Sequence, residues 1–121
     1  MAAIRDVLSS LLAIPGVRAA VLVARDGLPI EITGRGDSRF LETLGALGAS
    51  GMGTAEALGH ELAGGQVVAA IFEYEDAFVS VDPVGEYAVV VTLSETAASL
   101  GNIRTVVRTH RDDLLRLLDL L

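Results

Sequence analysis

The chain has 121 residues, a formal net charge of -7, 51% hydrophobic and 21% charged residues, and no cysteine. Its length and composition predict one globular domain spanning residues 1–121 and exclude a long disordered tail. The acidic net charge argues against a nucleic-acid partner, because phosphate binding requires clustered Lys and Arg. The lack of cysteine excludes catalysis by a thiolate and is consistent with a cytoplasmic protein.

The basic residues indicate the type of genome that encodes the protein, and the apolar runs bear on membrane insertion. All nine basic residues are arginines and the chain is rich in Ala, Gly, Val and Leu, a bias that predicts a GC-rich bacterial genome. The longest apolar runs, residues 67–72 and 88–91, are strand-sized, whereas a membrane-spanning helix needs about 20 apolar residues. No membrane insertion is therefore expected, and residues 1–12 lack the pattern of a signal peptide.

Residues 3–14 are predicted to form the first helix, because Ile4, Val7, Leu8 and Leu11 recur at spacings of three and four. A helix of this length is marginal alone in water, so it needs tertiary partners.

A β-hairpin is predicted over residues 17–33. Pro15 and Gly16 end the preceding helix, and the first half of the hairpin is rich in β-branched side chains. Asp26 and Gly27 suit the central positions of a type I′ turn, since both positions need positive φ.

The second helix is predicted to begin after Asp37 or Ser38, either of which suits an N-cap, and to end at Gly64 and Gly65. One line of small and apolar residues is expected to face a sheet: Leu41, Leu44, Gly48, Gly51, Ala55, Leu58 and Leu62. Each interior glycine costs up to about 1 kcal/mol relative to alanine, so some close packing must offset this cost.

Three further strands are predicted over residues 66–74, 77–81 and 87–93, and a last helix capped by Ser94 or Thr96 runs to the end of the chain. Neither face of residues 67–72 is polar, which predicts helices on both sides of the sheet there. The order is α-β-β-α-β-β-β-α.

This order, together with several local sequences, resembles the roadblock/LC7 superfamily and, within it, the MglB-type bacterial members that accompany small Ras-like GTPases. The residues that carry the resemblance are Pro15-Gly16-Val17, residues 20–23, residues 26–30 and residues 100–104. The resemblance covers nearly the whole chain. It implies an α/β (α+β), profilin-like fold with a five-stranded antiparallel sheet, the second helix on one face and the first and last helices on the other.

The resemblance also implies a homodimer, in which third strands join into one continuous sheet and second helices lie side by side. The implied interface comprises Gly45, Ala49, Met52 and Gly59 on the second helix and Val67, Ala69, Ile71 and Glu73 on the strand. An apolar edge strand would thereby become an interface instead of an aggregation hazard. The surface expected to face the GTPase comprises Arg39, Glu42, Ala46, Gly53 and Glu56.

No catalytic, cofactor or metal site is predicted. His60 and His110 lie on different helices without metal-ligand spacing, and nothing in the sequence brings Ser38 near His110 and Asp112 for hydrolysis. Arg104, Arg108 and Arg111 favour a solvated helix face over an arginine finger, because related activators are understood to reshape the GTPase's own loops. Those proteins bind one GTPase per dimer.

The predicted function is a non-enzymatic homodimer that regulates or scaffolds a small Ras-like GTPase, with stimulation of GTP hydrolysis as a narrower hypothesis. The alternative is a small-ligand sensor or structural interaction module built on a profilin-like sheet. The low aromatic content, 4% of residues, counts against a ligand pocket.

Overall fold

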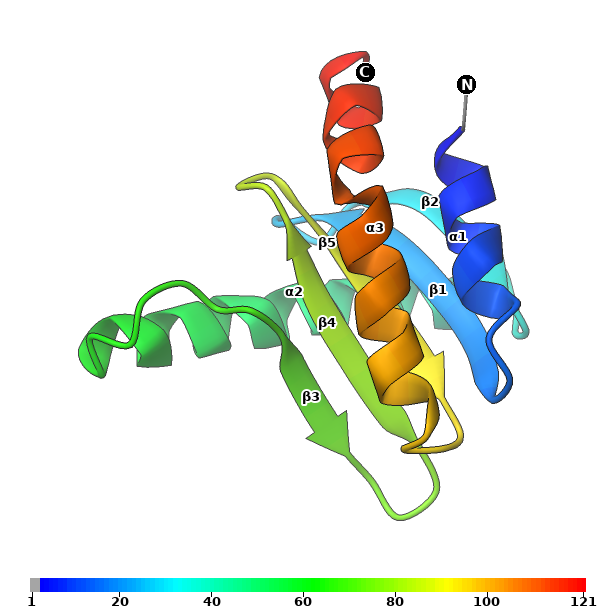
Figure 1. Cartoon of the computed structure of the whole chain (residues 1–121), viewed down its shortest axis with the longest axis horizontal. Coiled ribbons are helices and arrows are strands. Elements are labelled where there is room, and N and C mark those ends of the chain that lie inside the picture. Colours follow the sequence, from blue (N-terminus) through cyan, green and yellow to red (C-terminus); the bar gives the residue numbers. More distant parts are fainter. Residues whose placement is uncertain (1–2) are drawn as a thin grey trace.

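The computed structural model describes residues 3–121 as a five-stranded antiparallel sheet, in the order β2-β1-β5-β4-β3, with helices on both faces (Figure 1). The elements, in chain order, are α1 (Ile4–Leu12), β1 (Val17–Ala24), β2 (Pro29–Gly34), α2 (Ser38–Glu61), β3 (Ala70–Glu73), β4 (Phe78–Val84), β5 (Ala88–Ser94) and α3 (Ser99–Asp119). The predicted fold class and element order are confirmed.

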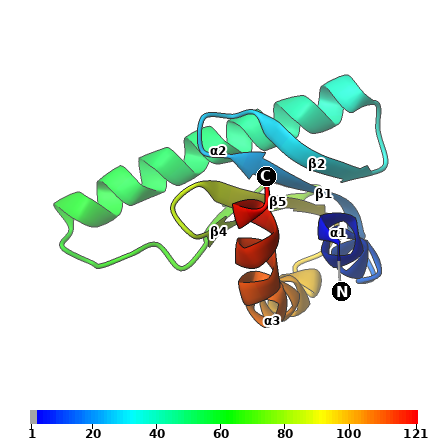
Figure 2. The same ribbon diagram turned by 90° about the horizontal axis from the view of Figure 1, so that it is seen from above.

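The sheet separates two cores, with α2 on one face and α1 and α3 on the other (Figure 2). The central strands β1 and β5 supply both cores, because their successive side chains point to opposite faces. Leu22 and Val90 pack toward α1 and α3, whereas Val21 and Val91 pack toward α2. All four are fully buried.

The turn between β1 and β2 differs from the predicted type I′ geometry. Ala24 and Leu28 close the hairpin through a 2.9 Å backbone hydrogen bond, leaving three residues in the loop, of which only Gly27 has positive φ. The Asp26 carboxylate accepts a hydrogen bond from the Leu28 backbone N–H, which lets Asp26 turn the chain without positive φ. After two-residue loops, three-residue loops that end in a glycine are among the most common hairpin connections.

The edge strand β3 is shorter than predicted, because residues 66–69 form part of the connection from α2. The expectation that helices cover both faces at this point is wrong: Ile71 is 50% exposed and Phe72 is 38% exposed. The neighbouring β4 is longer than predicted and includes Pro83. Proline is tolerated there because the β3–β4 ladder ends at Val81, so that β4 is an edge strand beyond it.

The helix caps follow the sequence at α2 and depart from it at α3. Asp37 is the N-cap of α2, and its Oδ1 accepts a 2.8 Å hydrogen bond from the Phe40 backbone N–H. The cap of α3 is Ala98, and the predicted Ser94 and Thr96 instead form hydrogen bonds within the turn before it. None of the helices within residues 3–121 combines the length and apolar character needed to cross a membrane.

Candidate functional site

Helix α2 lies unusually close to the sheet, and its glycines make this approach possible. A Cβ at Gly48 would lie 2.4 Å from Val91 Cγ2, and one at Gly45 would lie 2.9 Å from Val21 Cγ1. The poor helix propensity of these glycines is therefore offset by packing inside the protomer, not by a partner helix as predicted.

Three of the predicted interface residues belong to this internal contact. Gly45, Ala49 and Met52 are buried against the protomer's own sheet, and Met52 is completely inaccessible. Their side of α2 cannot receive a second helix, which corrects the predicted placement. The sequence already contained the reason: α2 is apolar on more than one side, and a spacing argument does not say which side the sheet takes.

The other predicted interface residues lie around the free edge of the sheet. Gly59 contacts the connection to β3, since its carbonyl accepts a hydrogen bond from the Gly64 N–H. Val67 and Ala69 are partly buried in that connection. Ile71 and Glu73 lie exposed on β3 itself.

Exposed apolar side chains lie on α2 and on the edge strand. On α2, Leu47, Leu58 and Leu62 are between 59% and 70% exposed and lie on one side of the helix by their spacing. On the strand side, the Phe72 ring lies beside Gly51 of α2. We call the group the edge surface; it comprises Leu47, Leu58, Leu62, Ile71, Phe72 and Tyr74.

The edge surface coincides with an overhang of α2. Figures 1 and 2 show that the C-terminal half of α2 extends past the last strand, β3, before the chain returns to the sheet. Two helix residues of the edge surface, Leu58 and Leu62, come from this half and its end. The C-terminal part of the line that was predicted to face the sheet therefore has no sheet beneath it.

The residues predicted to face a GTPase share the other exposed side of α2. Arg39, Glu42 and Gly53 are exposed, Ala46 lies under the β1–β2 turn beside Gly27, and Glu56 forms a salt bridge with Arg25. Gly53 has open space around it, with no atom within 4 Å of the position that a Cβ would take. The structure thus brings these five residues together on one side of the helix.

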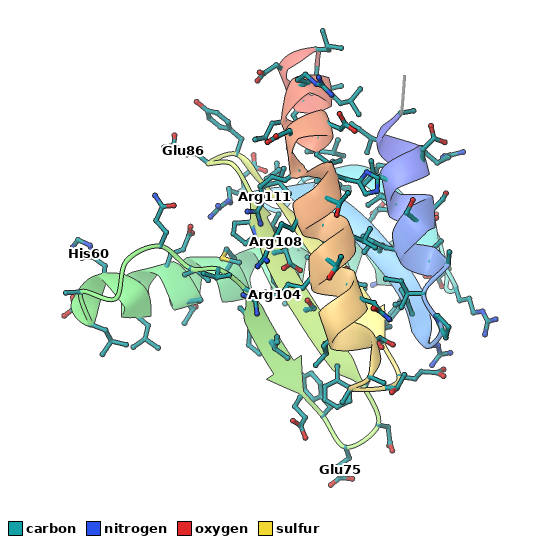
Figure 3. All side chains as sticks on the ribbon, in the orientation of Figure 1. His60, Glu75, Glu86, Arg104, Arg108 and Arg111 are labelled. Carbon is teal, nitrogen blue, oxygen red and sulfur yellow. The ribbon has the colours of Figure 1, made fainter. Side chains whose placement is uncertain are left out.

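A cleft of about 910 Å³ opens beside this side of α2. Its walls come from α2, the α2–β3 connection, the β4–β5 turn and α3, and they include Gly53, His60, Glu86 and Arg111. Figure 3 shows Glu86 and Arg111 on the far side of the cleft from His60. Sequence reasoning did not find this cleft, because it joins segments far apart in the chain.

Arg25 fixes the wall of the cleft at the end of β1. Its guanidinium donates hydrogen bonds to Glu56 Oε1 and, at 2.9 Å, to the Gly85 carbonyl. These contacts tie α2 to the β4–β5 turn through the two Nη atoms of Arg25, whereas its Nε atom is buried without a hydrogen-bond partner. The positive charge of Arg25 is therefore paired with Glu56, so an anionic ligand would have to compete with this salt bridge.

A buried acid lies under α3. Asp82 on β4 is 2% exposed, and burial raises the pKa of its carboxyl above the usual value of 3.8. A hydrogen bond from Ser80 Oγ and the charges of Arg104 and Arg111 oppose this rise in pKa. Asp82 is a buried structural acid on the opposite face of the sheet from α2.

The described part of the chain contains no group of three or more His, Asp or Glu side chains placed to hold a metal ion. Ser38 begins α2, whereas His110 and Asp112 belong to α3, so these residues lie on opposite faces of the sheet.

Residues 3–94 match a family model described as the roadblock/LC7 domain. The structure is similar to "MglB with tetrameric arrangement", with 26% identity, TM-score 0.81 and coverage of 93% of this chain and 85% of that one. It is also similar to the gliding protein mglB from Thermus thermophilus, with 24% identity, TM-score 0.82 and coverage of 97% and 89%. Profilin II from Acanthamoeba castellanii has 17% identity, TM-score 0.55 and coverage of 88% and 91%. No curated protein matches the chain.

Proposed function

The chain belongs to the roadblock/LC7 domain family, and on that premise we propose that it is a non-enzymatic, homodimeric regulator or scaffold of a small Ras-like GTPase. Bacterial members of this family accompany such GTPases, and two MglB structures are among the solved proteins that this chain resembles. The proposal places the protein in the bacterial cytoplasm. Stimulation of GTP hydrolysis is a narrower proposal within it.

The edge surface is the observation that carries the homodimer. An edge strand with unpaired backbone groups and exposed Ile71 and Phe72 invites pairing with another strand. A second copy presents the same strand and the same apolar side of α2, which satisfies the self-complementarity of a twofold interface. It would bury the leucines of the overhang and continue the sheet.

Light scattering coupled to size exclusion tests the homodimer. The wild-type protein should have twice the protomer mass at micromolar concentration, and Ile71→Lys should have the protomer mass. Leu28→Lys is the matched control, because Leu28 is 66% exposed on the distant β1–β2 hairpin and receives the same charge. A wild-type protein that remains monomeric would refute the homodimer.

The cleft side of α2 is the surface that we propose for the GTPase. This surface is exposed and combines the charged Arg39 and Glu42 with Gly53, which has open space around it. It lies on the side of the helix away from the edge surface. Surfaces of mixed polar and apolar character are typical of non-obligate interfaces. A GTPase could therefore bind without competing with the second copy for the same residues.

Binding to the GTPase encoded nearest to this gene tests the partner. The GTPase is loaded with a GTP or a GDP analogue, and we expect binding that Gly53→Arg weakens. Gly101→Arg is the matched control, since Gly101 is also an exposed helical glycine with open space around it. Absence of binding in both nucleotide states would reject the proposed GTPase, and equal binding by the two variants would reject the surface.

The cleft supports a second candidate, a small-ligand sensor. Its volume of about 910 Å³ lies in the range of ligand pockets, about 300–1,000 Å³. Thermal stabilisation by a metabolite, abolished by Gly53→Arg and retained in Gly101→Arg, would favour the sensor. We rank it second because Arg25, the natural anchor for an anion, is already bound to Glu56 and Gly85.

A further inference from the structure

Three arginines form a row along one side of α3. Arg104, Arg108 and Arg111 are spaced four and three residues apart, and Figure 3 shows them along the side of α3 that faces the free edge of the sheet. Within residues 3–121, none of them forms a salt bridge, although Arg5, Arg18, Arg25 and Arg116 do. The Nε atom of Arg111 is buried without a hydrogen-bond partner.

Within the described residues 3–121, the only acid assigned an electrostatic interaction with this arginine row is Asp82, which acts on Arg104 and Arg111 without forming a salt bridge. The carboxyl beneath the row, Asp82, is a single acid whose charged form is disfavoured by burial. In a chain of net charge -7, a row of three cations without salt bridges in the described residues is a local reversal of charge. It therefore fits an acidic group from outside the protomer.

The same chain carries an acidic tip without partners on the β3–β4 hairpin. Glu73, Glu75 and Asp76 are exposed, and none of them forms a salt bridge within the described chain. Because Phe72 points toward Gly51 of α2, the alternation of the strand turns Glu73 to the face that carries α3.

The geometry of an antiparallel β3–β3 pair decides where the tip of a second copy lies. Two identical edge strands pair antiparallel about an axis perpendicular to the sheet, which keeps the faces of both copies aligned. Directly opposed residues share a face, so Glu73 of the second copy lies on the α3 face, opposite an odd-numbered residue such as Ile71. Its acidic tip therefore emerges on the side of the sheet that carries the arginine row.

The antiparallel direction of the β3–β3 pair places the acidic tip of one copy near the arginine row of the other. Figure 3 shows Glu75 at the far end of the hairpin from Arg104, Arg108 and Arg111 within one copy. The arginine row lies beyond the beginning of β3, and the tip lies beyond its end. Antiparallel pairing reverses the second strand, so the tip of the second copy points toward the row of the first.

We propose that the acidic tip of each copy docks on the arginine row of the other, with Glu73 and Glu75 against Arg104 and Arg108. This inference rests on the proposed homodimer and adds a set of intermolecular salt bridges at each end of the β3–β3 pair. We call these salt bridges the charge lock. The lock fixes the register of a strand that is only four residues long and apolar on both faces. It also gives partners to Arg104 and Arg108 of each copy, which form no salt bridge within residues 3–121 of one protomer.

Two charge-reversed variants test the lock. In E73R/E75R both the tip and the row are positive, and in R104E/R108E both are negative, so each variant alone should dimerise at least about tenfold more weakly than the wild type. Mixed in equal amounts, they should form a heterodimer, because each tip then meets a row of opposite charge. Dissociation constants from sedimentation equilibrium at low and high salt measure the effect, and Arg35→Glu is the control on an exposed loop.

The outcomes separate the lock from the homodimer. Variants that dimerise as tightly as the wild type, or that fail to form a heterodimer on mixing, would overturn the lock while leaving the homodimer intact. A monomeric wild type would overturn the homodimer on which the lock rests. Circular dichroism of each variant checks that the exposed substitutions leave the fold unchanged.

Discussion

Replacing Gly48 by alanine tests whether close packing of α2 on its own sheet explains its glycines. The new Cβ would lie 2.4 Å from Cγ2 and 2.8 Å from Cγ1 of Val91. Val91 is fully buried on the central strand β5 and, being β-branched, has few rotamers through which to move away. The helix itself must therefore shift.

The expected magnitude follows from two opposing terms. Overpacking of a well-packed core costs about 1–3 kcal/mol, whereas alanine in place of glycine stabilises a helix interior by about 1 kcal/mol. Gly48→Ala should therefore lose about 1 kcal/mol of unfolding free energy. Gly53→Ala has open space and should gain about 0.5–1 kcal/mol, so the two variants should differ by about 2 kcal/mol.

Urea unfolding at one fixed protomer concentration measures this difference, since dimerisation would make stability depend on concentration. Thermal midpoints should separate by about 8 °C for a chain of this size. Val91→Ala in the Gly48→Ala background should recover part of the loss, because it removes the clashing methyl groups. A Gly48→Ala protein as stable as Gly53→Ala would refute the packing argument.

Two further predictions concern stability. Burial raises the pKa of Asp82, so its carboxyl stabilises the fold when protonated, and this contribution is lost as the pH rises through the raised pKa. Asp82→Asn should therefore exceed the wild type in unfolding free energy at neutral pH, and the difference should shrink toward about pH 4 in denaturation measured across that range. Asp37→Ala should lose about 1 kcal/mol in urea unfolding, whereas Asp37→Asn should lose little because its side-chain oxygen can still cap α2.

The elements could be predicted from the sequence because local chemistry determined them. Asp37 caps α2 as predicted, and the β-branched residues of segment 17–24 correctly predict β1. The predicted element boundaries were wrong where contacts with other parts of the chain determine the structure. Pro83 is tolerated in β4 because β3 no longer pairs with β4 at that position. Residues 66–69 lie outside β3, although their composition favours a strand.

The interaction surfaces were harder to predict than the fold. Glycine and apolar residues surround much of α2, and their spacing predicts an amphipathic helix without saying which stripe the sheet buries. The family resemblance implies that Gly45 and Met52 contact a partner, but both pack internally. The spacing predicts that Leu58 and Leu62 face the sheet, but both are exposed. The arginine row was visible in the sequence, but its counterpart in Glu73 needed the register of the strands.

The stoichiometry of the proposed GTPase complex depends on how two α2 helices would lie in the proposed dimer. A twofold axis that brings the edge surfaces together turns the two cleft sides away from each other, so each dimer offers two equivalent cleft sides. One GTPase per dimer, as family resemblance implies, therefore requires a footprint that reaches across the axis. Such a footprint must also cover the outward side of α2, around the exposed Ser50 and Ala57.

We therefore expect Ser50→Arg to weaken GTPase binding together with Gly53→Arg, without changing the mass of the dimer. Light scattering of the complex should give two protomers and one GTPase. Two GTPases per dimer, with Ser50→Arg binding like the wild type, would confine the footprint to one cleft side and contradict the single-GTPase expectation. The distinction matters mechanistically, because only a footprint across the axis makes the dimer itself a requirement for binding the GTPase.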